Sequence, residues 1–287
     1  SVKASFHGRT ERPARASDSS AKYYQVLASF RGREDLITVE ANNVAMLKEA
    51  FAQADRDGVY IETMMLEPVM GEGSPGLAVT PEFYEAAREL TKAHGSFLLI
   101  DSIQAGLRAQ GCLSIVDYPG FEKFPAPDME SYSKAINAGQ FPLSVLVLSK
   151  EAAANYREGI YGNTMTGNPR GLDVACAVLD QLDQGFITNL RARGAEFVAE
   201  LKKLQNEFPA AIEKVQGTGL LVAAFLKDPL FPVCGPDAIE QFMRRAGVNV
   251  IHGGKNALRF TPHFRITSKE IGLIVDGVRA ALRHFAK

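Results

Sequence analysis

The feature that most constrains the fold is a series of short apolar runs, each followed by small or polar residues. Four such runs lie in the first half of the chain, at residues 59–69 (VYIETMMLEPV), 96–102 (SFLLIDS), 128–133 (DMESYS) and 142–149 (PLSVLVLS). Their length and apolar content are typical of buried strands. Because helical segments alternate with such runs, the pattern predicts an α/β fold with a mostly parallel sheet covered on both faces.

The helix expected between the first two strands has clear boundaries. In TPEFYEAARELTKAHG (80–95), Thr80 can cap the helix, Pro81 suits its first position and Gly95 can end it. Residues 8–22, in contrast, are polar and charged, and we expect them to be irregular.

In the second half of the chain, the sequence predicts two helices and then an alternation of strands and helices. Asn168 and Pro169 are a cap and first position for a helix over 170–185, and a long amphipathic helix is expected over 186–208. Strand-like and helical segments then alternate, at 215–228, 236–246, 248–254, 257–264 and 268–286. We therefore predict two domains, with a larger one over 1–185 and a smaller C-terminal α/β domain over 186–287.

Composition excludes several classes of function. The net charge of −1 gives no support for nucleic-acid binding, and no apolar run has the roughly 20 residues of a membrane helix. The N-terminus lacks the apolar core of a signal peptide and does not begin with Met. The three cysteines, Cys112, Cys176 and Cys234, lie far apart, which favours buried or half-buried thiols in a reducing compartment, the cytoplasm or the mitochondrial matrix.

Residues that can carry chemistry lie just beyond the predicted strands, where open parallel sheets bind ligands. Asp101 ends one strand and is either a turn acid or a partner for a buried cation, and Gln104 can reach the same place. Lys134 follows the next strand and is either an exposed loop lysine or an amine held in a partly desolvated pocket, which makes it a nucleophile for Schiff-base formation.

Three further segments carry charge or polar groups suited to ligands. Glu67 and Glu72 flank a shaped turn, and Arg259 lies among apolar neighbours and therefore needs an anionic partner, either Glu72 or a substrate carboxylate. GNTMTGNP (162–169) is either a phosphate-binding loop, through Thr164 or Thr166, or an ordinary capped loop.

Metal chemistry has no support in the spacing of the histidines and cysteines. The set His94, His252, His263 and His284 shows no ligand spacing, so each is expected to be a surface or capping histidine, and no metal site is predicted.

Six blocks, in their order, resemble the class III aminotransferases, which include ornithine, acetylornithine and 4-aminobutyrate aminotransferases. The blocks span nearly the whole chain and are SFHGRT (5–10), LEPVMGEG (66–73), LLIDSIQAGLRAQG (98–111), DMESYSKAINAGQFPLS (128–144), GNTMTGNP (162–169) and LRFTP (258–262). The resemblance implies the fold-type-I scaffold, pyridoxal 5′-phosphate (PLP) as cofactor and a homodimer or higher oligomer with shared active sites.

The resemblance also implies roles for matching residues in holding PLP. Lys134 matches the lysine that forms the internal aldimine and shuttles the proton, and Asp101 matches the aspartate on the pyridinium nitrogen. Gln104 matches the glutamine near the 3′ oxygen. Phe6 matches the aromatic that stacks on the ring, with His7 beside it. Thr164 matches the threonine that reaches a phosphate in the neighbouring subunit.

For the substrates, Arg259 matches the arginine that binds the carboxylate of 2-oxoglutarate or glutamate. Glu72 resembles the glutamate that pairs with this arginine, and Glu67 belongs to the same block. The implied function is transfer of an amino group from an amine or amino-acid donor to 2-oxoglutarate by a ping-pong mechanism. The alternatives are a PLP aminomutase, racemase or decarboxylase on the same scaffold, and a non-catalytic structural subunit.

The sequence departs from the family pattern at several motif positions and in length. The family's D-E-[VI]-Q stands here as Asp101-Ser102-Ile103-Gln104, so one acid is replaced beside the cofactor aspartate. In the family, an N-terminal segment and a loop that supplies much of the phosphate site precede the S-F-H-G-R block. Neither is in this sequence, so we expect the N-terminal part of the large domain to be absent and do not expect this chain alone to hold PLP.

Overall fold

The computed structural model describes residues 1–20, 36–158, 164–227 and 229–286, and its chain forms two compact units. The first unit comprises Ser1–Pro68, Val79–Leu107 and Cys112–Leu182, and the second comprises Val69–Ala78, Arg108–Gly111 and Asp183–Lys287. Two short segments of the first half, a loop and the end of a helix, therefore belong to the second unit. The predicted division into 1–185 and 186–287 stays a prediction.

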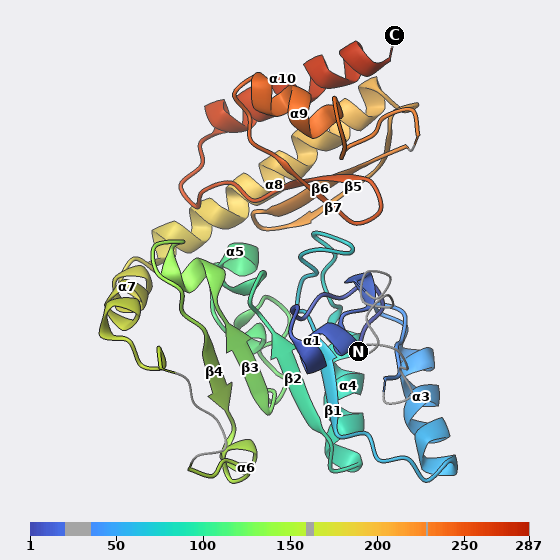
Figure 1. The fold of residues 1–287 in the computed structure, drawn as a ribbon, viewed down its shortest axis with the longest axis vertical. Coiled ribbons are helices and arrows are strands. Elements are labelled where there is room, and N and C mark those ends of the chain that lie inside the picture. The colour runs from blue at the N-terminus through green and yellow to red at the C-terminus, as the bar shows by residue number, and fades with distance from the viewer. Residues whose placement is uncertain (21–35, 159–163, 228, 287) are drawn as a thin grey trace. The chain divides into compact units, whose positions relative to one another are not determined.

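The first unit contains a four-stranded sheet in the order β1-β2-β3-β4 (Figure 1). Its strands are β1 (Thr63–Leu66), β2 (Phe97–Asp101), β3 (Met129–Tyr132) and β4 (Val145–Leu148). The first three run parallel and β4 is antiparallel to β3, which confirms the mostly parallel sheet. All four strands are shorter than the apolar runs that predicted them.

One face of the three parallel strands is buried, whereas the residues of β4 are half-buried or exposed. Along β1, β2 and β3 every second residue is buried, and helix α4 (Pro81–Ala93) packs on that face with Phe83 and Tyr84. The other face, which carries Met65, Leu99 and Met129, is only half-buried in the described residues. We expected both faces of the sheet to be covered. In the described residues, only one face of the three parallel strands is buried.

Helix α4 has the boundaries that its sequence predicts. Thr80 accepts a hydrogen bond from the amide of Phe83, Pro81 occupies the first turn, and Gly95 follows the helix with φ +68°. A buried ion pair ties the helix to the sheet, since Arg88 donates to both carboxylate oxygens of Asp128 at 2.8 and 3.0 Å. The same carboxylate accepts from the amide of Leu98 on β2.

The remaining helices before residue 183, in the part of the chain that the structure describes, are mostly short. They are α1 (Glu11–Ala16), α3 (Val44–Arg56), α5 (Gly106–Gln110), α6 (Lys150–Ala153) and α7 (Pro169–Leu179), with 3₁₀ turns at Asp18–Ser20, Ile115–Asp117 and Lys134–Asn137. The expectation of an irregular segment over 8–22 is wrong at α1. Helix α7 begins at the predicted Asn168 cap but ends at Leu179, before the predicted residue 185.

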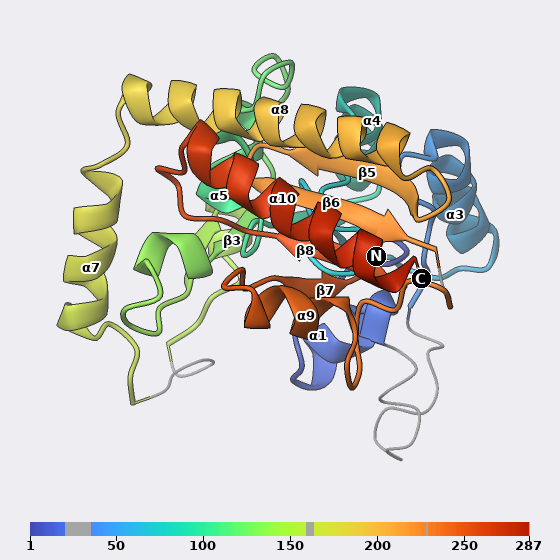
Figure 2. The ribbon, with the colours of Figure 1, turned by 90° about the horizontal axis from the view of Figure 1, so that it is seen from above.

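The second unit has a sheet in the order β5-β6-β8-β7, with antiparallel neighbours throughout. Its elements are α8 (Gln184–Glu207), β5 (Ile212–Thr218), β6 (Leu221–Leu226), α9 (Ile239–Arg245), β7 (Ile251–Gly253), β8 (Ala257–Phe260) and α10 (Ser268–Phe285). Helices α8 and α10 run side by side over one face of this sheet (Figure 2). Their apolar residues, with those of β6 and β8, form the core of this unit.

The single strand predicted over 215–228 is instead a hairpin of β5 and β6. The chain reverses at Gly219, whose φ is +54°. A Cβ atom at Gly219 would lie 1.9 Å from the carbonyl oxygen of Ala109, so the turn requires glycine both for its φ and for its close packing.

The cysteines differ from expectation. Cys112 is half-buried as predicted, but Cys176 and Cys234 are exposed. Cys176 lies on α7, where Leu172 and Leu179 are also exposed, and Cys234 lies in the loop before α9. In the part of the chain that the structure describes, no helix is both long and apolar enough to cross a membrane.

Candidate active site

Three predicted site residues follow the carboxyl ends of three adjacent parallel strands. Glu67 follows β1, Asp101 ends β2, and Lys134 comes two residues after β3. In the register of the sheet, Asp101 is paired with Ser131 on β3. Because these strands are parallel, the sheet brings the three residues to one edge, as the sequence predicted for a ligand site.

Asp101 and His7 form a buried pair at this edge. His7 Nδ1 lies 2.8 Å from Asp101 Oδ2, and the two side chains are 0% and 6% exposed. The second carboxylate oxygen accepts from the amide of Ile103 at 3.2 Å and from the hydroxyl of Ser131 at 3.4 Å. A carboxylate buried in this way is fixed in place, because each bond compensates part of its lost hydration.

The segment that carries His7 is held by hydrogen bonds to its backbone. Ser17 Oγ accepts from the amide of His7 at 2.8 Å, and Glu67 Oε1 accepts from the amide of Phe6 at 2.9 Å. Glu67 is 5% exposed. The Phe6 ring is half-buried, with the guanidinium of Arg9 at 5.4 Å from its centroid. Glu67 therefore positions Phe6 in this structure, and its predicted contact with substrate stays a prediction.

Lys134 has an unusual backbone conformation. Its φ is +45°, a left-handed value that a residue with a side chain rarely adopts and that costs about 1 kcal/mol. Such outliers persist where the surrounding structure imposes them, and they cluster at functional sites. The conformation is therefore an independent reason to consider Lys134 functional.

The turn around Lys134 is held from both sides. Ser133 Oγ donates to the carbonyl of Leu143 at 2.6 Å, and Asn137 Oδ1 accepts from the amide of Gly139 at 2.9 Å. Helix α7 packs on this turn, with Gly171 beside Phe141. The Lys134 side chain itself is exposed. Of the two alternatives left open for Lys134, the structure therefore shows the exposed lysine, and its role as a nucleophile stays a prediction.

Ser102, which replaces the family's second acid, contacts another buried carboxylate. Its hydroxyl donates to Glu130 Oε1 at 2.7 Å, and Ser114 and the amide of Ile115 donate to the same carboxylate at 2.8 and 3.1 Å. Burial raises the pKa of Glu130, and these hydrogen bonds oppose that rise. A glutamate at position 102 would place a second carboxylate against Glu130, so the departure from the family pattern has a local electrostatic reason.

The remaining predicted cofactor residues lie in the first unit. Gln104 is half-buried and lies three residues beyond Asp101, and Thr164 is exposed in the turn before α7. Residues 162 and 163 of the predicted phosphate-binding loop lie outside the described residues. The roles of Gln104 and Thr164 stay predictions.

The second unit brings Arg259 and Glu72 together. Arg259 on β8 donates through Nη1 to Glu72 Oε2 at 3.2 Å and to the carbonyl of Gly71 at 2.6 Å. The side chains are 11% and 32% exposed. Of the two partners left open for Arg259, the structure therefore contains Glu72, and a carboxylate ligand would compete with it.

The loop that carries Glu72 is fixed to the sheet of its unit. Gln216 Nε2 donates to the carbonyls of Ser74 and Pro75 at 3.2 and 2.9 Å, and Gly254 donates to the carbonyl of Glu72 at 2.7 Å. At Gly76, whose φ is +86°, a Cβ atom would lie 2.9 Å from the backbone of Gly217. This close approach explains why a glycine stands there.

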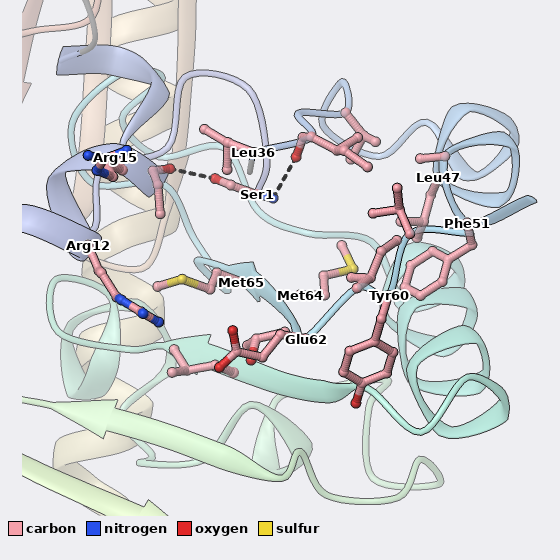
Figure 3. Close-up of a pocket in the computed structure, with 18 of the residues that line it drawn as sticks. Ser1, Arg12, Arg15, Leu36, Leu47, Phe51, Tyr60, Glu62, Met64 and Met65 are labelled. Carbon is pink, nitrogen blue, oxygen red and sulfur yellow. Dashed lines mark hydrogen bonds between the residues drawn. The ribbon is translucent and has the colours of Figure 1, made fainter. Parts of the chain in front are cut away.

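A separate cavity of about 580 Å³ lies in the first unit (Figure 3). Met65, Leu99 and Met129 line it from the half-buried face of the sheet, and Arg12 and Arg15 line it from α1. Neither Asp101 nor Lys134 is among its lining residues. Size alone would favour this cavity as a binding site, but the residues that can carry chemistry lie at the carboxyl edge, and we place the candidate site there.

The α/β fold described here is that of the fold-type-I PLP-dependent transferases. The chain belongs to the class III aminotransferase family, because the model of that family, Aminotransferase class-III, matches residues 1–282.

Curated relatives agree with this assignment. The chain is 33% identical to an acetylornithine aminotransferase of Ralstonia nicotianae over 282 residues, which cover 97% of this chain and 65% of the relative. It is 29% identical to ornithine aminotransferase 2 of Staphylococcus aureus over 280 residues, which cover 96% of this chain and 64% of the relative. The chain thus spans slightly less than two thirds of the length of these relatives.

A solved structure supports the fold. The ornithine aminotransferase of Toxoplasma gondii, in which PLP partly occupies the active site, superposes with a TM-score of 0.83. The match covers 100% of this chain and 65% of that chain at 24% identity. At this identity the likeness establishes the fold alone.

The residues at the sheet edge fit the ring of the PLP that this family uses. An ionised carboxylate offers about four acceptor positions. On the Asp101 carboxylate, the hydrogen bonds from His7, Ile103 and Ser131 occupy three of these positions, which leaves one acceptor position for a ring N–H. His7 Nε2 is also buried and has no hydrogen-bond partner among the described residues, and the burial of such a polar atom is unfavourable unless a ligand group approaches it.

Sequence reasoning found Asp101 and Lys134 but missed two features of the site. It placed His7 only beside Phe6 and did not foresee its pairing with Asp101, which is 94 residues away in the chain. It also treated Ser102 only as the loss of an acid. The signal that it overlooked was Glu130, an acid within the next predicted strand, whose carboxylate accepts a hydrogen bond from Ser102.

Proposed function

We propose that this protein is a PLP-dependent aminotransferase that moves an amino group from an amine or amino-acid donor to 2-oxoglutarate. The observation that carries the proposal is the buried Asp101–His7 pair at the carboxyl edge, one strand away from the left-handed Lys134. The pair supplies a fixed anion for a ring nitrogen, and the lysine supplies a basic amine.

Asp101 and His7 are proposed to hold and orient the cofactor ring. The position left on the Asp101 carboxylate accepts the ring N–H, while His7 fixes the carboxylate from the other side at 2.8 Å. Bound PLP supplies the electron sink that makes a substrate Cα–H acidic. Phe6, whose backbone Glu67 holds, is proposed to cover the ring, and Gln104 is proposed to contact its 3′ oxygen.

Lys134 is proposed to be the nucleophile for the cofactor and the group that takes up and returns the proton at Nζ. Proton transfer by a positioned side chain contributes about 10²- to 10⁴-fold to a rate. The turn around Lys134 positions it through Ser133, Asn137 and the packing of α7.

Arg259 and Glu72 are proposed to select the substrates by charge. A dicarboxylate such as 2-oxoglutarate would displace Glu72 and bind Arg259 through two parallel hydrogen bonds. A donor without a second carboxylate would leave the pair closed. The pair is partly exposed, so it can open at a small cost in free energy.

Assembly and location are proposed on the same basis. We propose a homodimer or higher oligomer in which Thr164, exposed here, reaches the phosphate held by a neighbouring subunit. The three cysteines form no disulfide, which favours the cytoplasm or the mitochondrial matrix.

The test is a half-reaction of the full-length gene product loaded with PLP. L-glutamate is added without an amino acceptor, and the formation of 2-oxoglutarate is measured per chain. We expect about one equivalent per active site, since the amino group stays on the enzyme. Ornithine and acetylornithine, for which the relatives are named, are the donors to test next.

Two results would contradict the proposal in different ways. If PLP binds but L-glutamate and the tested amines release no oxo product, the protein carries out another PLP reaction, such as racemisation or decarboxylation. If the full-length product does not bind PLP, the chain is a non-catalytic member of the family.

A further inference from the structure

In the second unit, three side chains with metal-binding atoms, none of them among the residues assigned to the candidate active site, converge. The Sγ atom of Cys234, a carboxylate oxygen of Glu240 and a ring nitrogen of His252 all lie within 4.8 Å of one another. They come from the loop after β6, the first turn of α9 and strand β7. Among the described residues, no other group of three acidic, histidine or cysteine side chains meets this description.

The three ligand types and their spacing fit a tetrahedral zinc ion. Zinc binds thiolate sulfur at about 2.3 Å, and imidazole nitrogen and carboxylate oxygen at about 2.0–2.2 Å. Two such nitrogen and oxygen ligands lie about 3.3 Å apart, and sulfur lies about 3.6 Å from either. His252 Nδ1 is 3.2 Å from Glu240 Oε2. The nitrogen and the oxygen thus already have the required separation, and sulfur needs a shift of about 1 Å at most.

The backbone holds all three ligands in place. The amide of Val233, next to Cys234, donates to the side chain of Asn256 at 2.9 Å, and Asn256 in turn donates to the carbonyls of Leu226 and Phe231. The amide of Glu240 donates to the carbonyl of Val233 at 3.1 Å. His252 lies opposite Leu258 in the ladder between β7 and β8. A metal would therefore meet a largely preformed site.

The charges in the group favour a cation. The carboxylate of Glu240 is buried, and the sulfur of Cys234 and a ring nitrogen of His252 lie within 4.8 Å of it. A divalent ion that replaces the thiol proton would be neutralised by one thiolate and one carboxylate, and the proton would leave to solvent.

The site is open to solvent and favours soft metals. Cys234 and His252 are exposed and only Glu240 is buried, so a metal can enter and one coordination position stays with water. Thiolate and imidazole ligands select zinc-class ions over magnesium or calcium. We propose that Cys234, Glu240 and His252 bind one zinc-class divalent ion, which ties the loop before α9 to α9 and to β7.

The test is metal binding by the reduced, tag-free, full-length protein in the absence of amino acids. We expect one equivalent of Zn²⁺ per chain by equilibrium dialysis and elemental analysis. We also expect Co²⁺ to give a thiolate-to-metal charge-transfer absorption that Zn²⁺ abolishes. Cys234→Ser and His252→Asn, both at exposed positions, should each weaken Zn²⁺ binding at least about tenfold.

Two matched variants serve as controls. Cys176→Ser removes an exposed thiol elsewhere, and His263→Asn removes an exposed histidine that lies 3.2 Å from Glu270 but belongs to no such group. Both should leave Zn²⁺ binding unchanged. Zn²⁺ should also raise the Tm of the wild-type protein and not that of Cys234→Ser, because only a ligand that binds the native state stabilises it.

The proposal is wrong if the wild-type protein binds no stoichiometric Zn²⁺, or if Cys234→Ser binds it as well as the wild type does. It is also wrong if either control variant abolishes binding. Half an equivalent per chain together with zinc-dependent association would instead indicate a site shared between two copies. None of these results depends on PLP or on transamination.

Discussion

The two acid–base pairs assigned to the candidate active site differ in how far they are removed from water. The side chains of Asp101 and His7, in the first unit, are 6% and 0% exposed, whereas those of Glu72 and Arg259, in the second, are 32% and 11% exposed. Asp101 is also fixed by Ile103 and Ser131, while Glu72 contacts Arg259 at 3.2 Å through a single nitrogen.

This difference teaches what each pair is suited to do. A buried pair loses hydration that only its own hydrogen bonds replace, so it persists in one geometry and suits the fixed demands of a cofactor ring. The Glu72–Arg259 pair is partly exposed and loses less hydration, and we propose that its arginine exchanges one carboxylate for another. The predictions below test this contrast, beginning with the largest expected effect.

The largest effect should come from Lys134, which tests whether the edge with the buried pair is the chemical centre. Lys134→Ala should lower the rate of amino transfer by about 10³-fold or more, because it removes the residue that we propose as both nucleophile and proton carrier. The control is Lys150→Ala, another exposed lysine in the same unit, which should stay within about twofold. Equal losses in both variants would contradict the assignment.

The next effect concerns stability and compares the two pairs directly. Asp101→Ala should lower the free energy of unfolding by about 2–3 kcal/mol, because it leaves His7 buried without its partner. Glu72→Ala should change it by less than about 1 kcal/mol. Urea denaturation of both variants measures the two losses in the free energy of unfolding. Equal losses would contradict the claim that only the Asp101–His7 pair is fixed by burial.

Arg259 should affect substrate binding more than the fold. Arg259→Ala should raise the KM for 2-oxoglutarate by about 10- to 100-fold, the equivalent of losing one charged hydrogen-bonded contact. Arg259→Lys should recover only part of this, because an ammonium does not form two parallel bonds to a carboxylate. Steady-state kinetics with a donor held at saturation measures both, and an unchanged KM in Arg259→Ala would exclude this role.

Ser102 and Glu130 extend the contrast to a second buried carboxylate. Ser102→Ala removes a 2.7 Å hydrogen bond to Glu130 and should lower the free energy of unfolding by about 1.5 kcal/mol at neutral pH. Burial holds the pKa of Glu130 above its usual 4.5. The stability that the raised pKa of Glu130 contributes is therefore fully present below about pH 4.5. It is lost as the pH rises through the pKa that Glu130 has in the folded protein.

Glu130→Gln removes this titration. The stability of the wild type relative to Glu130→Gln should therefore fall as the pH rises through the folded pKa of Glu130. Denaturation curves measured at several pH values give this difference. A difference that rises with pH would mean that the carboxylate is stabilised in the fold, which contradicts the dominance of burial.

The smallest effect should come from Glu72. Glu72→Gln keeps the size of the side chain but removes the carboxylate that competes for Arg259, so the KM for 2-oxoglutarate should fall about two- to fivefold. Glu122→Gln, an acid in a loop of the first unit, is the control and should leave KM unchanged. A rise in KM for Glu72→Gln would mean that Glu72 positions Arg259 and does not compete for it.

Local signals predicted those parts of the fold that depend on neighbouring residues. Thr80 and Asn168 cap their helices as their types and spacing indicate, and Asp101 ends its strand where the apolar run stops. The hairpin at Gly219 was missed, because Thr-Gly between two apolar runs is a weak turn signal. What forces that turn is the approach of Ala109, from another part of the chain.

Long-range contacts explain the other differences. His7 reaches Asp101 across 94 residues, and His252 reaches Glu240 from a different element of its unit, so no local spacing reveals either contact. The family resemblance indicated Lys134 and Arg259 but not the exposure of the lysine. That exposure depends on which side chains cover the sheet edge, and single-residue patterns do not encode it.

The most direct test of the central claim is to locate the cofactor lysine. The full-length protein is loaded with PLP, reduced with borohydride and digested, and the peptide that carries the pyridoxyl group is identified by mass spectrometry. We predict that the group is on Lys134, and that Asp101→Ala lowers its yield while Lys150→Ala does not. A pyridoxyl group on any other lysine, or on none, would contradict the site described here.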